Sequence, residues 1–264
     1  MIDKKELILD SIIKEYLKRF EPIGSEYLKE QLEIKISPSS IRGYFKKLED
    51  VGFLMQVHIS SGRIPTAVAL KRYWENRLLP LQTLDIGSSV NLKNSSNKTN
   101  IYFVAKFKPN NRFLEVINAN NKYLVLVFEN TEVLIEYSEV LEKALSKFIN
   151  FSLDDLIEIS YQIGAHTLHK KLKSAIKEQR VERSKLDELV NIYTNFNMKQ
   201  DNFSDAIDGE LIDKLQDGIY FNLYADNGYM MIKQNAIIED EFAKLLIVGT
   251  IYRDFEQFFE IIKS

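Results

Sequence analysis

Residues 37–66 have the sequence SPSSIRGYFKKLEDVGFLMQVHISSGRIPT, and this stretch decides the fold of the N-terminal part. Ser37 followed by Pro38 is typical of a helix start, because a serine side chain accepts free N–H groups and proline lacks the N–H that would otherwise be unsatisfied. Apolar side chains then recur at helical spacing, at Ile41, Phe45 and Leu48. The stretch therefore predicts a helix with one buried face and one exposed face.

A short β-hairpin is predicted directly after this helix. Residues 53–58 form a strand candidate, and Ser60-Ser61-Gly62-Arg63 has the composition of a turn. Pro65 restricts the return arm to an edge strand, because proline cannot donate a ladder hydrogen bond. Thr66 is placed to cap a following helix that extends to residue 79.

Two further helices are predicted before residue 37. Apolar positions in residues 3–20 have helical spacing, and Pro22 and Gly24 interrupt the pattern. Ser25 then has the position of an N-cap for a short helix that ends near residue 32. Three helices followed by a hairpin is the order of a winged helix-turn-helix, which we expect to occupy residues 1–80.

The charge distribution singles out the same segment. Residues 1–80 carry 14 Lys and Arg against 11 Asp and Glu, whereas residues 81–264 carry 21 against 27. Only the N-terminal part therefore has the sign of charge that phosphate binding requires. A solvated face on an ordinary small helical bundle is the alternative explanation of this excess.

The rest of the chain predicts a linker and an α+β domain with an insertion. Residues 81–100 are rich in Ser and Asn, which favours a linker. Short β-branched and aromatic runs in residues 101–138 indicate strands, and strand-like runs return in residues 210–264 before a last helix. Residues 139–209 have a helical pattern, so we expect an inserted helical segment between two halves of one domain.

The predicted third helix carries the best candidates for DNA contact. Its N-terminal residues would meet base edges in the major groove, with Arg42 suited to a bidentate contact to guanine. Lys46 and Lys47 are expected to contact phosphates, and Arg63, placed at the hairpin tip, a minor groove or the backbone. The complete set of candidate DNA-binding residues is Ser25, Ser37, Ser39, Ser40, Arg42, Lys46, Lys47, His58, Ser60, Ser61 and Arg63.

Other residue clusters leave alternatives open. His58 either contacts a phosphate or orients its turn. His166 and His169 are three apart on a predicted helix, where a solvent-facing or packed pair is favoured over a metal site. The aromatic residues Tyr220, Phe221, Tyr224 and Tyr229 line a ligand cavity or form ordinary core. The chain has no cysteine and no phosphate-loop or nucleophile motif, so we expect no enzyme activity and no cofactor.

Four sequence blocks resemble the heat-inducible transcription repressor family HrcA. They are Pro22-Ile23-Gly24-Ser25, Ser37-Pro38-Ser39-Ser40-Ile41-Arg42, Leu48-Glu49-Asp50-Val51-Gly52-Phe53-Leu54 and His58-Ile59-Ser60-Ser61-Gly62-Arg63-Ile64-Pro65-Thr66. They follow the family's order and spacing across residues 5–75. Gly43 departs from the family, which has Asn after the arginine. A C-terminal stretch, Gly249 to Phe255, is only a partial match to a family motif.

The resemblance implies a homodimeric repressor of chaperone operons that binds an inverted-repeat operator called CIRCE, with its activity supported by the GroE chaperonin. It also implies that residues 101–138 and 210–264 form a GAF-like domain and that residues 139–209 form a dimerising segment. The alternative is a winged-helix regulator that senses a ligand through its GAF-like domain. No signal sequence or long apolar run is present, so a cytoplasmic location is expected.

Overall fold

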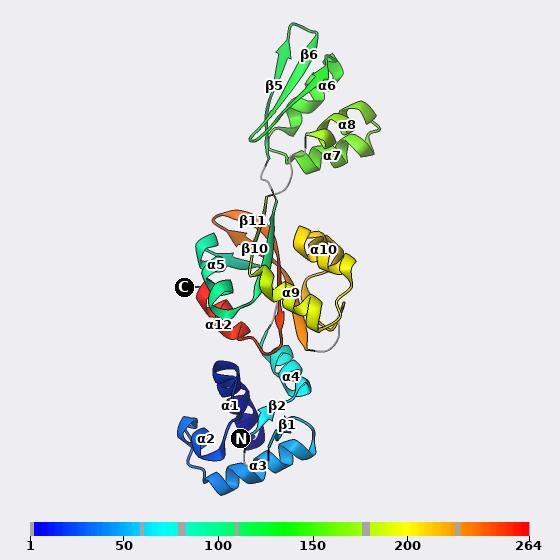
Figure 1. The fold of residues 1–264 in the computed structure, drawn as a ribbon. Helices are drawn as coiled ribbons and strands as arrows, with labels where there is room; N and C mark the ends of the chain where they lie inside the picture. Colours follow the sequence, from blue (N-terminus) through cyan, green and yellow to red (C-terminus); the bar gives the residue numbers. More distant parts are fainter. Residues whose placement is uncertain are drawn as a thin grey trace. The chain divides into compact units, whose positions relative to one another are not determined.

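The computed structural model describes residues 3–58, 61–78, 83–108, 111–175, 180–224 and 228–263. The fold is of the mixed α+β class, and the chain divides into two compact units. The first unit comprises Met1–Lys106 and Val181–Ser264, and the second comprises Phe107–Arg180. Figure 1 shows the ribbon coloured along the sequence.

Three helices, a two-stranded ribbon and a fourth helix form the N-terminal part of the first unit. Their bounds are α1 (Lys4–Arg19), α2 (Ser25–Gln31), α3 (Pro38–Asp50), β1 (Leu54–Met55), β2 (Ile64–Pro65) and α4 (Ala67–Arg77). Ser37 accepts a hydrogen bond from the Ser40 N–H, and Thr66 accepts one from the Ala69 N–H, so both predicted caps are confirmed. Gly24, not Ser25, is the residue that precedes α2, and it offers no side-chain cap.

A six-stranded sheet forms the centre of the first unit, with strand order β3-β10-β11-β4-β8 and β9 paired to β10. The strands are β3 (Leu84–Ile86), β4 (Tyr102–Phe107), β8 (Val181–Ser184), β9 (Gly218–Phe221), β10 (Tyr229–Ile238) and β11 (Glu241–Thr250). Helices cover both faces of this sheet, with α5 (Ser89–Thr99) and α12 (Phe255–Ile262) on one side and α9 (Leu186–Asn195) and α10 (Gln200–Asp208) on the other (Figure 1). Helix α11 (Glu210–Lys214) shares a buried cluster with α9.

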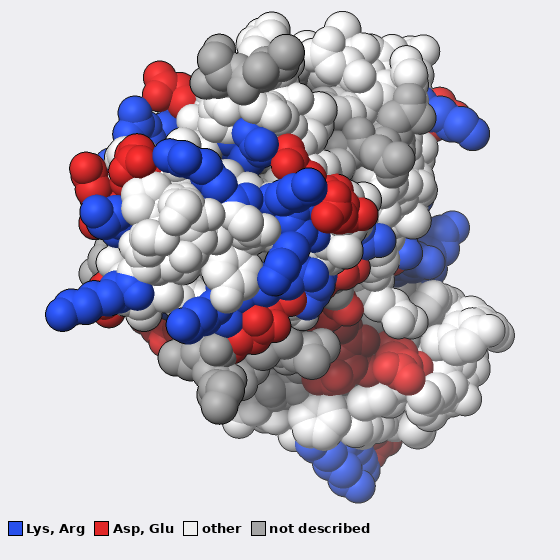
Figure 2. Space-filling model, turned by 90° about the horizontal axis from the view of Figure 1, so that it is seen from below, with Lys and Arg blue, Asp and Glu red and all other residues white. Residues whose placement is uncertain are grey.

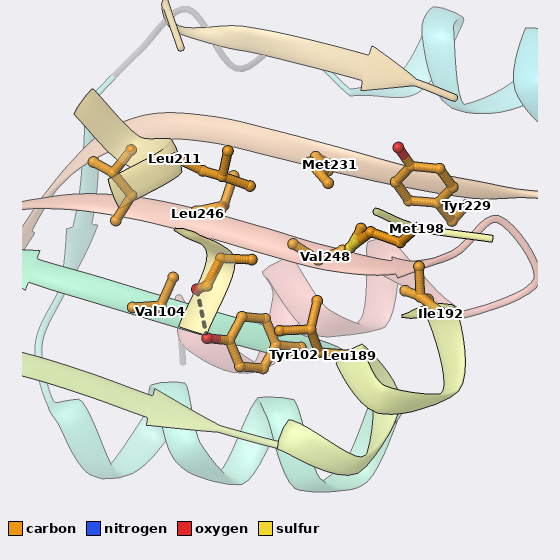
Figure 3. Close-up of a cluster of buried hydrophobic side chains, with 12 residues drawn as sticks. Tyr102, Val104, Leu189, Ile192, Met198, Leu211, Tyr229, Met231, Leu246 and Val248 are labelled. Carbon is orange, nitrogen blue, oxygen red and sulfur yellow. Dashed lines mark hydrogen bonds between the residues drawn. The ribbon is translucent and has the colours of Figure 1, made fainter. Parts of the chain in front are cut away.

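The α9–α11 face of the sheet holds a fully buried apolar cluster, drawn in Figure 3. Tyr102 and Val104 of β4 and Met231 of β10 meet Leu189 and Ile192 of α9 in it. Tyr102 is buried among these apolar residues and donates its hydroxyl to the Ala206 carbonyl at 2.9 Å. A buried hydroxyl without such a partner would be costly, so this hydrogen bond fixes α10 on the sheet.

The predicted linker at residues 81–100 needs correction, because β3 and α5 lie within it. Serine and asparagine have low helix propensity, but the α5 hydroxyls are satisfied by backbone carbonyls. Ser95 donates to the Phe258 carbonyl at 2.6 Å and Ser96 to the Ile101 carbonyl at 2.7 Å. These small side chains are buried against α12 and β4, so packing outweighs local propensity.

The boundaries of the insertion also need correction. Only β4 of residues 101–138 joins the central sheet, and the next three strands form a separate sheet in the second unit. Residues 181–209, expected to be inserted, return to the first unit, and β8 interrupts the segment that was predicted to be helical. Alternating apolar residues predict a strand but not the sheet that it joins, because hydrogen-bond partners are set by tertiary contacts.

The second unit is a three-stranded sheet covered by helices. Its elements are β5 (Phe113–Ala119), β6 (Tyr123–Phe128), β7 (Glu132–Glu136), α6 (Glu139–Leu145), the 3-10 helix η1 (Ser146–Phe148), α7 (Leu153–Gln162) and α8 (His166–Ser174). The strands are antiparallel in the order β5-β6-β7. Leu124 and Leu126 of β6 are buried in its core together with Leu156 and Leu172 of the helices.

A buried ion pair joins α9 to the end of β11. Glu188 is 2% exposed, and its carboxylate accepts from Arg253 Nε at 3.0 Å and Nη2 at 2.6 Å. The Thr250 N–H also donates to this carboxylate at 3.2 Å. Three donors therefore compensate the loss of hydration of one buried negative charge.

We predict that Arg253→Met lowers the free energy of unfolding by about 3–5 kcal/mol, because it leaves the Glu188 carboxylate buried without its main partner. Chemical denaturation followed by circular dichroism measures this loss. The double variant Glu188→Met with Arg253→Met should recover much of the stability, since no unpaired charge remains. An additive loss in the double variant would contradict this account.

Candidate nucleic-acid interface

Helix α3 presents one buried and one exposed face, as its spacing predicts. Ile41, Phe45 and Leu48 are at most 3% exposed and pack on the other helices of the N-terminal part. Ser37 hydrogen-bonds the hydroxyls of Ser39 and Ser40, each at 2.9 Å, in addition to capping the helix. The exposed face therefore begins with three hydroxyl groups that can donate to or accept from a nucleic acid.

Arg42 lies on the exposed face of α3 and contacts α2. Its Nε donates to the Ser25 hydroxyl at 3.0 Å, and its Nη2 donates to the Glu26 carboxylate at 3.2 Å. Both charged side chains are more than 60% exposed. An ion pair this exposed stabilises by about 0–1 kcal/mol, so little energy opposes transfer of the guanidinium to a stronger acceptor. Ser25 is thus a partner of Arg42 and not the predicted N-cap.

Several lysines around α3 form no ion pair with a carboxylate of the described residues. Lys46 and Lys47 are exposed, and the Lys47 ammonium lies 5.4 Å from the Tyr44 ring centre. Lys29 of α2 and Lys35 are not among the residues predicted to bind DNA, and they line a surface hollow next to Ser37. Within the described ranges, Lys29, Lys35 and Lys46 form no ion pair, whereas Lys18 and Arg72 are paired with carboxylates.

The arrangement gives the α3 side of the molecule a locally basic character. Figure 2, seen from below the view of Figure 1, shows Lys and Arg side chains gathered on this face with Asp and Glu between them. The signal for Lys29 and Lys35 was their place in the charge excess before α3. Lys35 is close to Ser37 in the sequence, whereas the fold brings Lys29 beside the same hollow. Unpaired lysines in such a position attract phosphate groups over a Debye length.

The turn of the β-ribbon is stabilised by Ser61. The Ser61 hydroxyl accepts from the His58 N–H at 3.0 Å and donates to the His58 carbonyl at 2.8 Å. The side chain of His58 is exposed to solvent, whereas its backbone N–H and carbonyl help to form the turn. Ser60, another predicted contact, lies outside the described residues.

The prediction that Arg63 lies at the hairpin tip is wrong. Its N–H and carbonyl pair with Ile23 at 2.9 and 2.8 Å, which places it at the base of the ribbon. Its Nε lies 2.7 Å from a Glu49 carboxylate oxygen, and the side chain is 19% exposed. Arg63 directly precedes β2, two residues after the turn that His58 and Ser61 close, and its bridge to Ile23 keeps it away from the tip. We assign Arg63 a role in holding the ribbon against α3.

The other candidate sites have structural explanations. His169 Nδ1 lies 3.0 Å from the Ile157 carbonyl, so His169 packs between α7 and α8, and no group of three metal-ligating side chains occurs in the described ranges. Tyr229 is fully buried, and its hydroxyl accepts from the Tyr224 N–H at 2.7 Å.

None of the helices that the structure describes combines the length and the apolar character needed to cross a membrane.

Comparison with known proteins identifies the family. Residues 74–264 match the family model described as the HrcA C-terminal domain. A curated protein of Helicobacter pylori, named heat-inducible transcription repressor HrcA, is 30% identical and covers 100% of this chain and 96% of its own length. This chain belongs to the HrcA family. The family's relatives carry the name of a transcription regulator and not that of an enzyme.

Two further comparisons show how far the likeness extends. The protein of the same name from Natranaerobius thermophilus is 51% identical over 63 residues, which are 24% of this chain and 18% of that protein. A crystal structure of a protein described as hypothetical covers 100% of this chain and 95% of its own, with a TM-score of 0.52 and 16% identity. At that identity the second likeness concerns the fold alone.

Gly62, which belongs to a family motif, and Gly43, which departs from one, give a pair of opposite predictions. A Cβ atom at Gly62 would lie 2.4 Å from the carbonyl carbon and oxygen of Ile23, so Gly62→Ala must displace the ribbon. A Cβ at Gly43 would meet no atom within 4 Å. We predict that Gly62→Ala lowers the free energy of unfolding by about 1–3 kcal/mol, whereas Gly43→Ala raises it by up to about 1 kcal/mol.

Thermal and urea unfolding of both variants measure these opposite effects. Equal stability of Gly62→Ala and the parent chain would show that the ribbon does not require its close approach to Ile23.

Proposed function

We propose that this HrcA-family chain is a heat-inducible transcription repressor that reads an inverted-repeat operator with α3. One observation carries the proposal: α3 exposes hydroxyls and Arg42 in its first turns, next to lysines that form no ion pair among the described residues. The N-terminus of such a helix suits the major groove, because its first residues reach base edges. We further propose that α1 to β2 form a winged helix-turn-helix.

The candidate DNA-binding side chains fall into groups with different roles in this proposal. Ser39, Ser40 and Arg42 meet base edges, with Arg42 leaving Glu26 to contact a guanine. Lys46 and Lys47 bind phosphates, as do Lys29 and Lys35 beside Ser37. His58 and Ser61 at the ribbon turn approach the neighbouring DNA backbone. Ser60 stays a candidate from the sequence alone. Arg63 is excluded from this set because Glu49 holds its guanidinium.

Dimerisation follows from the two-fold symmetry of an inverted repeat. The second unit offers a surface for it, in place of the predicted segment 139–209. On the sheet face away from its core, Ile117, Val125 and Leu134 lie directly opposite one another across β5, β6 and β7. Ile117 is 45% and Leu134 is 51% exposed. An apolar row of this kind favours burial against a second copy.

The family resemblance extends the proposal to the targets and the partner. It implies that the chain represses chaperone operons that carry the CIRCE operator. It also implies that the GroE chaperonin supports this repressor activity. It also implies that the central sheet with its helices is a GAF-like domain. The name of the Helicobacter pylori relative supports the heat response, because that protein is called a heat-inducible transcription repressor.

We predict that Arg42→Ala weakens binding to the inverted repeat by about 1–3 kcal/mol and leaves binding to a scrambled duplex nearly unchanged. Lys46→Ala should weaken binding to both duplexes alike and reduce the salt slope by about one. Gel-shift titrations at several salt concentrations measure both effects. Equal affinity of the parent chain for the two duplexes would refute sequence-specific reading.

We predict that Leu134→Lys raises the dimer dissociation constant at least tenfold, which corresponds to about 1.4 kcal/mol. Burying an ammonium in an apolar interface is unfavourable, so the dimer should dissociate. Light scattering coupled to size exclusion measures the mass. Val140→Lys is the matched control, because Val140 is 76% exposed on α6 and lies off this sheet face. A dimer that persists in Leu134→Lys would place the interface elsewhere.

A further inference from the structure

Glu26 lies beside Arg42 on the exposed face that α2 and α3 form together. It belongs to the first turn of α2, its side chain is 69% exposed, and its carboxylate accepts from Arg42 Nη2 at 3.2 Å. The Ser25 hydroxyl accepts from Nε of the same guanidinium at 3.0 Å. Glu26 is not among the candidate DNA-binding residues, yet it contacts the arginine to which we assign a base.

The negative charge of Glu26 works against general attraction to DNA. The lysines around α3 attract phosphate groups, whereas a carboxylate among them repels phosphates over the Debye length. Figure 2 shows that acidic side chains do lie between the basic ones on this face. Ser25 shows that a neutral acceptor is sufficient to hold one donor of Arg42. Holding Arg42 in place therefore does not by itself account for a charged residue at position 26.

A contact between Arg42 and a guanine changes the surroundings of Glu26. In the proposed complex the Nη2 of Arg42 leaves the carboxylate, which then faces the groove without this cation. A carboxylate has only acceptor atoms, so a base edge compensates it only by offering a donor.

The pattern of base edges in the major groove singles out cytosine as the partner of a carboxylate. Cytosine presents the N4 amino group, whereas guanine and thymine present acceptor oxygens. Adenine presents the N6 amino group beside N7, and N7 is an acceptor that repels a carboxylate. Cytosine is thus the base that Glu26 suits best.

We propose that Glu26 is a specificity-determining residue of the operator contact. Its carboxylate accepts a hydrogen bond from the N4 amino group of a cytosine next to the guanine that Arg42 contacts. The two side chains already touch in the free protein, so they extend to neighbouring base pairs. On a duplex without a donor at this position, the uncompensated carboxylate opposes binding. This inference rests on the proposed function, since it requires α3 to lie in the major groove.

Glu26→Gln in the full chain tests the role of the charge. Glutamine keeps the size and one acceptor oxygen, but it lacks the charge and adds donors that tolerate other bases. Gel-shift titrations should show nearly the parent affinity for the CIRCE duplex and tighter binding to a scrambled duplex. We expect the ratio of the two affinities to fall at least about fivefold. The variant should melt nearly as the parent does, because the pair that it alters is exposed.

Glu21→Gln is the matched control. Glu21 is also an exposed carboxylate paired with an arginine, because Arg19 Nη2 lies 3.1 Å from it, but it precedes α2 and does not contact Arg42. This variant should keep the parent ratio of affinities. An equal fall in both variants would assign the effect to net charge alone and overturn the role of Glu26.

A panel of altered CIRCE duplexes locates the base. In each duplex, one C·G pair is replaced by T·A at the same position of both half-sites. Arg42→Ala should become insensitive to replacement of the pair that holds its guanine, and Glu26→Gln to replacement of a neighbouring pair. If both variants become insensitive at the same single pair, Glu26 acts only by positioning Arg42, and the proposed base contact is wrong.

The failure of this inference is distinguishable from the failure of the proposed function. Equal affinity of the parent chain for the CIRCE and scrambled duplexes would refute both. A parent chain that discriminates between them, together with a Glu26→Gln variant that keeps the parent ratio and the parent sensitivity at every pair, would refute the role of Glu26 alone.

Discussion

The packing of Ile41, Phe45 and Leu48 beneath α3 is the constraint on which the N-terminal part depends. These three side chains bury one face of the helix and leave the opposite face to solvent. The cap from Ser37 fixes where the helix begins, so the exposed serines and Arg42 occur in its first turns. Since the helix is positioned by its core face, its outer face is free to carry polar groups that contribute little to folding.

Helix α4 connects this part to the central sheet through a small set of directional contacts. Trp74 is fully buried, lies edge-on to Phe255 at 5.4 Å between ring centres, and donates to a backbone carbonyl. Tyr73 donates to Glu256 at 2.7 Å, and burial together with this carboxylate raises the pKa of Tyr73 far above its usual value. Contacts of this kind restrict how the helices move against the sheet.

The topology explains how the chain accommodates its second unit. Strands β4 and β8 are antiparallel neighbours, with Lys106 opposite Val181. The chain therefore leaves and re-enters the first unit at adjacent positions. When the ends of an insertion are held together, closing that loop adds little to the entropic cost of folding the first unit. The apolar core of the second unit stabilises the insertion separately. The sheet of the first unit thus remains continuous across a 74-residue excursion, Phe107–Arg180.

The sequence by itself determined the local elements that depend on spacing and end signals. Ser37-Pro38 with three apolar positions predicted α3 and its exposed face, and the repressor motifs predicted the family, because these signals lie within a few residues of each other. Tertiary structure alone decided that Arg63 pairs with Glu49, that the serine-rich α5 is a helix, and that the Gln234 Nε2 has no hydrogen-bond partner among the described residues. Those outcomes depend on side chains brought together from distant parts of the chain, and no local pattern records which surfaces will meet.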